Sequence, residues 1–375
     1  MLFVRIITSV ISRLSPSLRW LTPLVWCLAI APAMAMELRV GIEQGLGEVS
    51  VGSSTTATVK DGSGQVLGQL QGMQAFLAVA NGNKIALSQW ETAQLWIEPT
   101  DGGSVYIGDR WYRGRTRLVI SDGGVTVVNH VDMDEYLYSV VGAEMSPNWH
   151  LEALKAQAVA ARSYALYQKE KRGNSVYDVG DDTYWQVYVG MEKEDPSTIA
   201  AVTATSGQVL AYNGSPIEAV FHSSSGGHTE DVERIWQDPR PYLRGVPDYD
   251  ANSPNFQWTE TFSQSQLNNV FSGVGNVLNL QPAQTTPHGR AMTLNLVGDG
   301  GTRSIDGDAV RTALNLPSTL FSVTANSGAF VVSGRGFGHG VGMSQWGALT
   351  LAERGYSYSQ ILGHYYQNTT LSQLQ

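Results

Sequence analysis

The sequence predicts an α+β fold, with a β-rich body and a few helices. Glycine is abundant, with 40 of 375 residues, and charged residues make up only 15% of the chain. Short β-branched runs alternate with glycine-rich turns at 38–42, 104–108 and 118–128, a pattern typical of strands joined by tight turns. One long helical pattern, at 151–165, stands apart from these runs.

The first 35 residues have the pattern of a cleaved secretion signal. Three arginines precede an apolar stretch at 20–31, and Ala33-Met34-Ala35 has the small-x-small form of a signal peptidase site. The alternative is an uncleaved anchor, but the apolar run is shorter than the roughly 20 residues that a spanning helix needs. We therefore expect export to the periplasm or cell wall, a mature chain that begins near Met36, and no transmembrane anchor in it.

The predicted mature chain is acidic and contains no cysteine. The single cysteine, Cys27, lies in the signal, and loss of the signal's three arginines changes the formal charge from −9 to −12. Disulfides and thiolate-metal sites are therefore excluded. An acidic chain without a basic run also argues against nucleic acid as a partner.

Residues 36–128 form the first predicted region of the mature chain. This region shows strand patterns, no helix signal and no cluster of titratable groups, and the run at 118–128 is a good hairpin candidate. We expect it to act as a scaffold or to contact the cell wall.

A second region begins at 129 and carries the strongest pattern in the chain. A short helix is expected to end near Val141, with Glu144 just beyond it, and Asn148 can cap the helix that follows. Leucines and alanines line one face of that helix at steps of three and four. Its other sides carry Lys155 with Arg162, and Gln157 with Tyr164. We therefore expect Glu144 to lie in a substrate groove beside this helix.

This stretch closely resembles a known family. The run from Tyr136-Leu137 through Glu144-Met145 to 152–165 is similar to the signature of the stage II sporulation protein D (SpoIID) family. The resemblance implies a SpoIID-like catalytic domain at 129–375, with a core motif at 129–229, and a peptidoglycan lytic transglycosylase whose catalytic glutamate maps onto Glu144. Without the resemblance, Glu144 would be better interpreted as an ordinary surface carboxylate near the start of a helix. LytB-like amidase enhancers are related proteins, so a partner amidase is the other implied role.

An aromatic segment at 180–190 reads as strand-like. Gln186 and Tyr188 match the family's glutamine-x-tyrosine pattern, which makes Gln186 a candidate for substrate contact. The alternative is a place in the core, because aromatic residues in a half-buried strand are as often core as binding surface. Asp181 and Asp182 are weaker candidates.

The stretch at 202–217 predicts a hairpin around Asn213-Gly214, and a loop from His222 to His228 follows. In some SpoIID relatives a cysteine in this loop helps to hold zinc, whereas this chain has serine. Two histidines make a poor zinc site, because structural zinc takes four good ligands. We therefore expect no metal and no cofactor, with His222 either a substrate contact or a structural histidine.

The motif at 334–348 has glycine at every second position from Gly334 to Gly342 and is a second SpoIID-like motif. In an extended strand, one face would be bare backbone, while Arg335, Phe337 and His339 would project from the other. The spacing matches neither a dinucleotide fingerprint nor a nucleophile elbow. We expect His339 and Gln345 to position the substrate.

A lytic transglycosylase needs one carboxyl that serves twice. Protonated Glu144 would donate to the glycosidic oxygen and, as carboxylate, take the proton of the muramic acid C6 hydroxyl, which requires a raised pKa. Lys155 and Arg162 would orient substrate groups, and Gln157 on the same helix is a further candidate for substrate binding. The expected substrate is the glycan strand of peptidoglycan, stripped of stem peptides if family behaviour holds. A hydrolase would instead recruit a second carboxylate, such as Asp132, Asp134 or Asp182.

Overall fold

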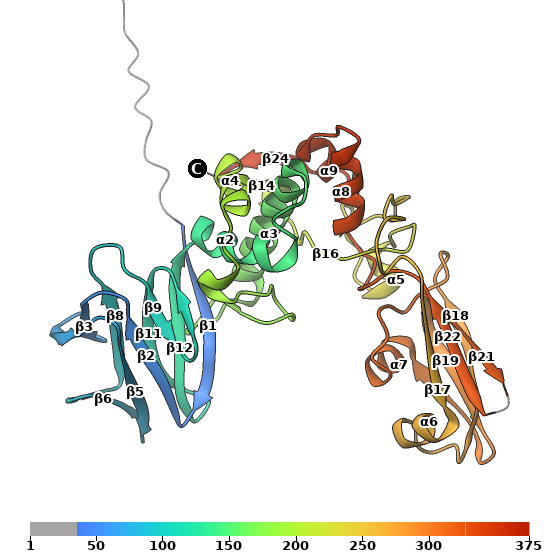
Figure 1. The fold of residues 1–375 in the computed structure, drawn as a ribbon, viewed down its shortest axis with the longest axis horizontal. Helices are drawn as coiled ribbons and strands as arrows, with labels where there is room; N and C mark the ends of the chain where they lie inside the picture. The colour runs from blue at the N-terminus through green and yellow to red at the C-terminus, as the bar shows by residue number, and fades with distance from the viewer. Residues whose placement is uncertain (1–35, 327, 375) are drawn as a thin grey trace, which may run out of the picture. The chain divides into compact units, whose positions relative to one another are not determined.

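The computed structural model describes residues 36–326 and 328–374, so the predicted signal segment lies outside the described residues (Figure 1). Strands β1 to β24 and helices α2 to α9 confirm the α+β, strand-rich fold. None of the described helices is long and apolar enough to span a membrane.

The N-terminal region is built of strands only. They form a seven-stranded sheet in the order β13-β1-β12-β11-β8-β3-β4 and a six-stranded sheet in the order β10-β9-β2-β5-β6-β7. Alternate residues of β3 and β8 are buried, as expected for strands with one face in a core. The bounds are β1 (Glu37–Leu46), β2 (Glu48–Ser53), β3 (Ala57–Asp61), β4 (Val66–Leu70), β5 (Gln74–Asn81), β6 (Lys84–Leu87), β7 (Trp90–Thr92), β8 (Gln94–Pro99), β9 (Val105–Ile107), β10 (Arg110–Tyr112), β11 (Arg115–Ser121) and β12 (Gly124–Asp132).

The hairpin predicted at 118–128 is confirmed. Strands β11 and β12 pair antiparallel up to Ser121 and Gly124. The two residues between them, Asp122 and Gly123, have φ of 52° and 81°. Positive φ at both turn positions gives the twist that a two-residue hairpin requires, and aspartate followed by glycine tolerates it well.

Helices α2 (Met133–Glu144), α3 (Leu151–Arg172) and α4 (Pro196–Ala204) follow, with the short 3-10 helix η3 (Gly190–Lys193). Helix α2 runs to Glu144 instead of ending near Val141. The cap of α3 is His150, whose Nδ1 accepts from the Glu152 N–H at 3.2 Å, so the expectation of an Asn148 cap is wrong. The imidazole satisfies the free N–H of the first turn just as a shorter polar side chain would.

Helix α3 is buried around nearly its whole circumference. Helices α2, α4, α8 and α9 and strand β14 all contact it, and its alanines, from Ala153 to Ala165, are fully buried. Alanine lets neighbouring backbones approach closely. The residues predicted to form one narrow apolar face therefore belong to a central helix that other elements cover on all sides.

Two segments expected to be extended are extended only in part. Within 180–190, only the first residue pairs as a strand, in β13 (Val179–Gly180), and the rest is turns and η3. The predicted 202–217 hairpin is shorter, because a capping box of Asp195 and Thr198 starts α4, which runs to Ala204. The hairpin itself joins β14 (Gln208–Tyr212) and β15 (Ser215–Pro216) around Asn213-Gly214.

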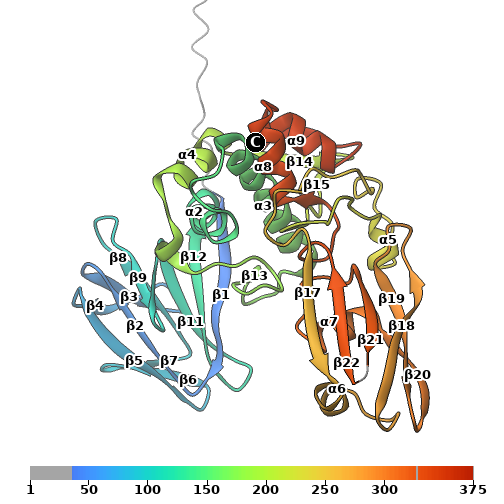
Figure 2. The same cartoon turned by 45° about the vertical axis from the view of Figure 1, so that its right-hand side comes forward.

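The C-terminal third contains a unit with its own hydrophobic core, separate from the main core. Two three-stranded sheets form it, in the orders β17-β22-β21 and β18-β19-β20, with helices α6 and α7 (Figure 2). Its bounds are β17 (Trp258–Ser263), α6 (Gln264–Val270), β18 (Val277–Thr285), β19 (Ala291–Gly298), β20 (Gly301–Asp306), α7 (Gly307–Ala313), β21 (Phe321–Asn326) and β22 (Ala329–Gly334). The other elements are β16 (Phe221–His222), α5 (Val232–Ile235), β23 (Met343–Ser344), α8 (Gln345–Glu353), α9 (Tyr358–Tyr365) and β24 (Thr370–Gln373).

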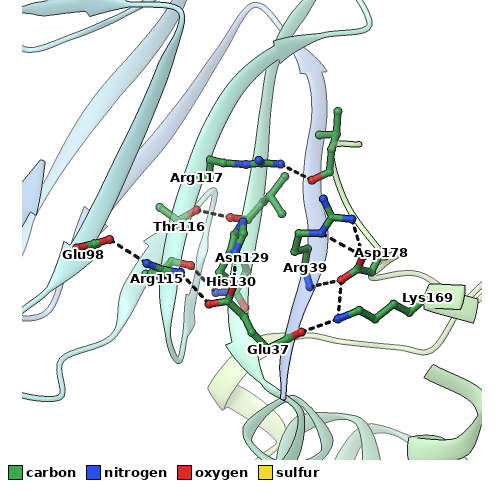
Figure 3. Close-up of polar contacts among 12 residues, drawn as sticks. Glu37, Arg39, Glu98, Arg115, Thr116, Arg117, Asn129, His130, Lys169 and Asp178 are labelled. Atoms are coloured by element: carbon green, nitrogen blue, oxygen red, sulfur yellow. Dashed lines mark hydrogen bonds and ion pairs between the residues drawn. The ribbon is translucent and has the colours of Figure 1, made fainter. Parts of the chain in front are cut away.

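Polar contacts tie the loop after α3 to the N-terminal sheet (Figure 3). The Asp178 carboxylate accepts from the backbone N–H and from Nε of Arg39, both at 3.0 Å. Lys169 donates to the Glu37 carbonyl at 2.8 Å, and Arg117 donates to the Val176 carbonyl. These contacts anchor the chain just before Thr183, where it begins to line a cavity.

Candidate active site

A cavity of about 1320 Å³ contains Glu144. Both charged and aromatic side chains line it. The titratable and amide side chains are Glu144, Gln168, Arg172, Glu218, His222, Asp238, Arg240, Asp308, Arg311, His339 and Gln345. The aromatic side chains are Tyr164, Tyr184, Trp185, Phe221, Trp236 and Phe337.

Glu144 is the last residue of α2 and is partly buried. Its Oε2 accepts from Nε2 of Gln345 at 3.3 Å, and its Oε1 accepts from the Val187 N–H at 3.5 Å. Burial raises the pKa of Glu144, and these two long hydrogen bonds offset only part of the rise. The carbonyl end of α2 also disfavours a negative charge there. The carboxyl is thus held closer to the protonated form than an exposed glutamate.

Gln345 reaches Glu144 because of a short parallel bridge. Strand β23 pairs with β16, so that His222 lies opposite Ser344. The Ser344 hydroxyl accepts from the Gly347 N–H at 3.1 Å and caps α8. Gln345, the first residue of α8, is thereby placed beside the cavity with its amide directed at the Glu144 carboxylate.

Two neutral histidines lie in the same wall, with ring centroids 5.2 Å apart. His222 donates from Nδ1 to the Val341 carbonyl at 3.1 Å, and its buried Nε2 has no hydrogen-bond partner among the described residues. His339 donates from Nε2 to the Phe221 carbonyl at 2.9 Å and accepts at Nδ1 from the Val341 N–H. Burial lowers the pKa of His339 to about 4 and that of His222 well below its ordinary value.

The glycine motif is not an extended strand, so that expectation is wrong. Gly336, Gly338, Gly340 and Gly342 have φ of 74°, 105°, 77° and 72°, values that favour glycine. A Cβ on Gly340 would lie 2.1 Å from Nη2 of Arg290. The bare positions therefore admit protein groups, not a saccharide.

Four of the predicted binding residues do not line this cavity: Lys155, Gln157, Arg162 and Gln186. Lys155 pairs with Glu152 at 2.8 Å, and fully buried Arg162 pairs with Asp134 at 2.7 Å. Gln157 is buried in the core, and Gln186 donates to the Ala161 carbonyl at 3.3 Å. Helical spacing correctly identified which of these share a side of α3, but other elements cover those sides. We assign the four residues to the fold and not to the substrate.

Several cavity residues were not singled out from the sequence. Tyr184 is 65% exposed, Trp236 and Phe337 are each 44% exposed, and all three line the cavity. Nη1 of Arg172 donates to the Tyr184 hydroxyl at 2.8 Å. Local signals existed for the aromatic residues, in the aromatic content of 180–190 and in the glycine motif that contains Phe337, but they did not indicate a cavity.

The residues in the His222 loop do not fit a zinc site. His228 is stacked on His288 at 3.6 Å and its Nδ1 contacts the Thr229 carbonyl, while Nδ1 of His222 is held by Val341. Ser224 and Ser225 donate to Asp250 and Asp248. Within 36–326 and 328–374, no three histidine, cysteine or acidic side chains are grouped to hold a metal.

The chain matches two family models and several proteins. Residues 121–212 match the model for Stage II sporulation protein (SpoIID), and residues 242–342 match a domain of unknown function, DUF8618. Stage II sporulation protein D of Bacillus amyloliquefaciens is 36% identical over 270 residues, covering 66% of this chain and 76% of that protein. An uncharacterized protein of Brachyspira hyodysenteriae is 33% identical over 264 residues, covering 69% and 72%. The amidase enhancer of Bacillus subtilis is 34% identical over 291 residues, covering 63% and 40%. The chain therefore belongs to the stage II sporulation protein D (SpoIID) family.

Proposed function

We propose that this protein is an exported peptidoglycan lytic transglycosylase that cleaves the bond between N-acetylmuramic acid and N-acetylglucosamine. The observation that carries the proposal is the Glu144 carboxyl, which lies in a large cavity with a raised pKa and two long hydrogen bonds. In the described part of the chain, no charged partner contributes to that pKa. A raised pKa favours a carboxyl that donates a proton and later takes one back.

The proposed reaction needs one proton donor and no captured water. Protonated Glu144 donates to the bridging oxygen as the bond from the muramic C1 to that oxygen breaks. The C6 hydroxyl of the same sugar then attacks C1, and its proton passes to the Glu144 carboxylate, which yields a 1,6-anhydro end. Gln345 holds the carboxyl in place through its hydrogen bond to Oε2. No step is routed through a metal.

The cavity lining supports a saccharide as the ligand. Three exposed aromatic side chains, Tyr184, Trp236 and Phe337, line the cavity. Their rings can pack on the apolar faces of sugars while hydroxyl and amide groups reach the polar lining. A length of glycan strand fits this combination better than a small apolar ligand does.

The hydrolase alternative finds no support at the three carboxylates considered for it. Asp132 accepts from the Asp134 N–H as the cap of α2, and Asp134 pairs with Arg162. Asp182 accepts from the Tyr184 N–H in a turn. None of the three lines the cavity, whereas Glu218, Asp238 and Asp308 do, so the chemistry of the cleaved ends decides between one carboxyl and two.

The test is digestion of purified glycan strands by the wild type and by Glu144→Gln. The amide keeps the shape of the side chain but cannot transfer the proton, so we expect cleavage to fall at least about 100-fold with an unchanged circular dichroism spectrum. Wild-type products should carry 1,6-anhydromuramic acid ends. Equal rates for the two proteins would refute the assignment of Glu144, and reducing ends alone would make the reaction a hydrolysis.

A second candidate function is activation of an N-acetylmuramoyl-L-alanine amidase at the cell wall. It is favoured by the similarity to the protein named amidase enhancer, although the match covers only 40% of that protein. The discriminating assay adds a purified amidase to both proteins on intact wall. If neither protein cleaves glycan and both stimulate the amidase equally, the activator function replaces the enzyme.

A further inference from the structure

We propose that Arg311, on α7, binds a carboxylate of the glycan and so determines which strands the cavity accepts. The inference rests on the proposed function, because it names a chemical group of that substrate. It also gives a role to part of the region 242–342, which matches a domain of unknown function. Arg311, Asp308 and Thr312 of α7 line the same cavity as Glu144.

Helix α7 is held firmly against the glycine motif. The Pro317 carbonyl accepts from the Gly338 N–H at 3.0 Å and lies 3.5 Å from Nε of Arg311. One acceptor therefore serves both the arginine and the residue before His339. The Ser318 hydroxyl donates to the Arg335 carbonyl at 2.7 Å nearby. Arg311 is therefore linked to the motif through Pro317.

A fully buried arginine adds a second anchor. Arg290, from the same C-terminal unit, donates to the Gly338 carbonyl at 3.2 Å and to the Ser225 carbonyl at 2.9 Å. Gly340 leaves room for that guanidinium. Two sets of hydrogen bonds thus hold the part of the cavity wall that carries Arg311. The Arg311 guanidinium can therefore bind a ligand without large reorganisation of this wall.

The guanidinium of Arg311 is weakly engaged. Its Nη1 lies 3.2 Å from Asp308, whose side chain is 70% exposed. An exposed ion pair of this kind contributes about 0–1 kcal/mol, so exchange of Asp308 for a ligand carboxylate costs little. Two other arginines line the cavity: Arg240 lies 3.5 Å from Glu218, and Arg172 donates to the Tyr184 hydroxyl at 2.8 Å.

The chemistry of the site selects a carboxylate. Arginine offers a planar fork of N–H donors that matches a carboxylate in a bidentate arrangement, and the Thr312 hydroxyl lies on the same helix. Asp308 and Asp238 also line the cavity and repel negatively charged ligand groups. A ligand carboxylate is therefore favoured at one defined position, beside the Arg311 guanidinium. In peptidoglycan this carboxylate comes either from the lactyl group of peptide-free muramic acid or from a stem peptide.

The test is calorimetric binding in a Glu144→Gln background, where no cleavage occurs. The ligands are peptide-free glycan, the same glycan with its carboxyls amidated, peptide-bearing glycan and neutral chito-oligosaccharide. We expect Arg311→Gln to weaken binding of carboxylate glycan about tenfold, the loss of one charge-assisted hydrogen bond, with no change for the amidated glycan or the chito-oligosaccharide. Arg303→Gln, on exposed β20, is the matched control and should bind as the background does.

The two glycan forms identify the source of the carboxylate. A loss confined to peptide-free glycan assigns the lactyl group, and a loss confined to peptide-bearing glycan assigns the peptide. An equal loss on the neutral ligand, no loss on either glycan, or no glycan binding by the background would overturn the proposal. Binding is measured without turnover. The binding result for Arg311 can therefore be interpreted even if the cleavage test for Glu144 fails.

Discussion

The Nε2 of Gln345 donates a hydrogen bond to Oε2 of Glu144 at 3.3 Å, although the two residues are 201 positions apart in the sequence. The bond lowers the pKa of Glu144, against the larger rise caused by burial. Gln345 therefore sets how readily the carboxyl gives up its proton, and it links the two most family-like segments of the chain.

Replacing Gln345 should change the pH dependence of cleavage. Gln345→Leu removes the donor, which raises the Glu144 pKa further, so the alkaline fall in kcat should move to higher pH because the acid must be protonated to act. We expect kcat at neutral pH to drop about tenfold, since a hydrogen bond that orients the carboxyl is lost. Gln345→Glu should move the alkaline fall further in the same direction, because a second carboxylate repels the charge. An unmoved alkaline limb in both variants would contradict the role given to Gln345.

Glu144→Gln should stabilise the folded protein at neutral pH. A raised folded-state pKa means that the native state binds the proton more tightly than the unfolded state, so wild-type stability declines as pH rises through that pKa. The amide has no such penalty. We expect the Tm of the variant to exceed that of the wild type by a few degrees at pH 7.5, with the difference vanishing near pH 4. A variant less stable than the wild type at pH 7.5 would show that the folded protein stabilises the Glu144 carboxylate instead of disfavouring it.

Arg162 and Lys155 of α3, which were expected to bind substrate, should instead stabilise the fold. Their contributions to the free energy of unfolding should differ. Arg162→Met leaves Asp134 without its fully buried partner, and we expect a loss of about 3–5 kcal/mol in the free energy of unfolding. Lys155→Met breaks a partly buried pair with Glu152, whose side chains are 19% and 23% exposed, and should cost about 1 kcal/mol. Denaturant titration measures both. If Lys155→Met raises KM tenfold while stability is unchanged, the substrate role returns.

Gly340→Ala tests why the motif contains glycine. A Cβ there would lie 2.1 Å from Nη2 of buried Arg290, and φ is 77°. Gly214, at a hairpin turn with φ of 81°, has nothing within 4 Å of an added Cβ, so Gly214→Ala measures the backbone strain alone. We expect about 1–2 kcal/mol for Gly214→Ala and at least twice that for Gly340→Ala. Equal losses in denaturant titration would mean that Arg290 shifts freely and does not anchor the wall.

Local sequence patterns predicted several elements of the fold and several residues of the cavity. The β11–β12 hairpin follows from alternating β-branched residues around Asp122-Gly123, and α3 follows from a run of alanine and leucine. The sequence also singled out Glu144, together with His222, His339 and Gln345 in its cavity. Turn chemistry and short-range periodicity operate within a few residues, so a single chain displays them directly.

Only the tertiary structure decided which side chains meet the cavity. Helical spacing placed Lys155 and Arg162 on one side of α3, yet which side faces a ligand depends on α2, α4, α8 and α9, which lie far along the chain. Alternating glycines suggested a strand, but contacts with Arg290 and Val220 impose positive φ instead. The segment around Arg311 was assigned to folding, and only the structure places this arginine in the cavity lining and in contact with Pro317, which also accepts from the glycine motif. Such long-range packing selects the exposed face of each element, and residue spacing within one element does not encode it.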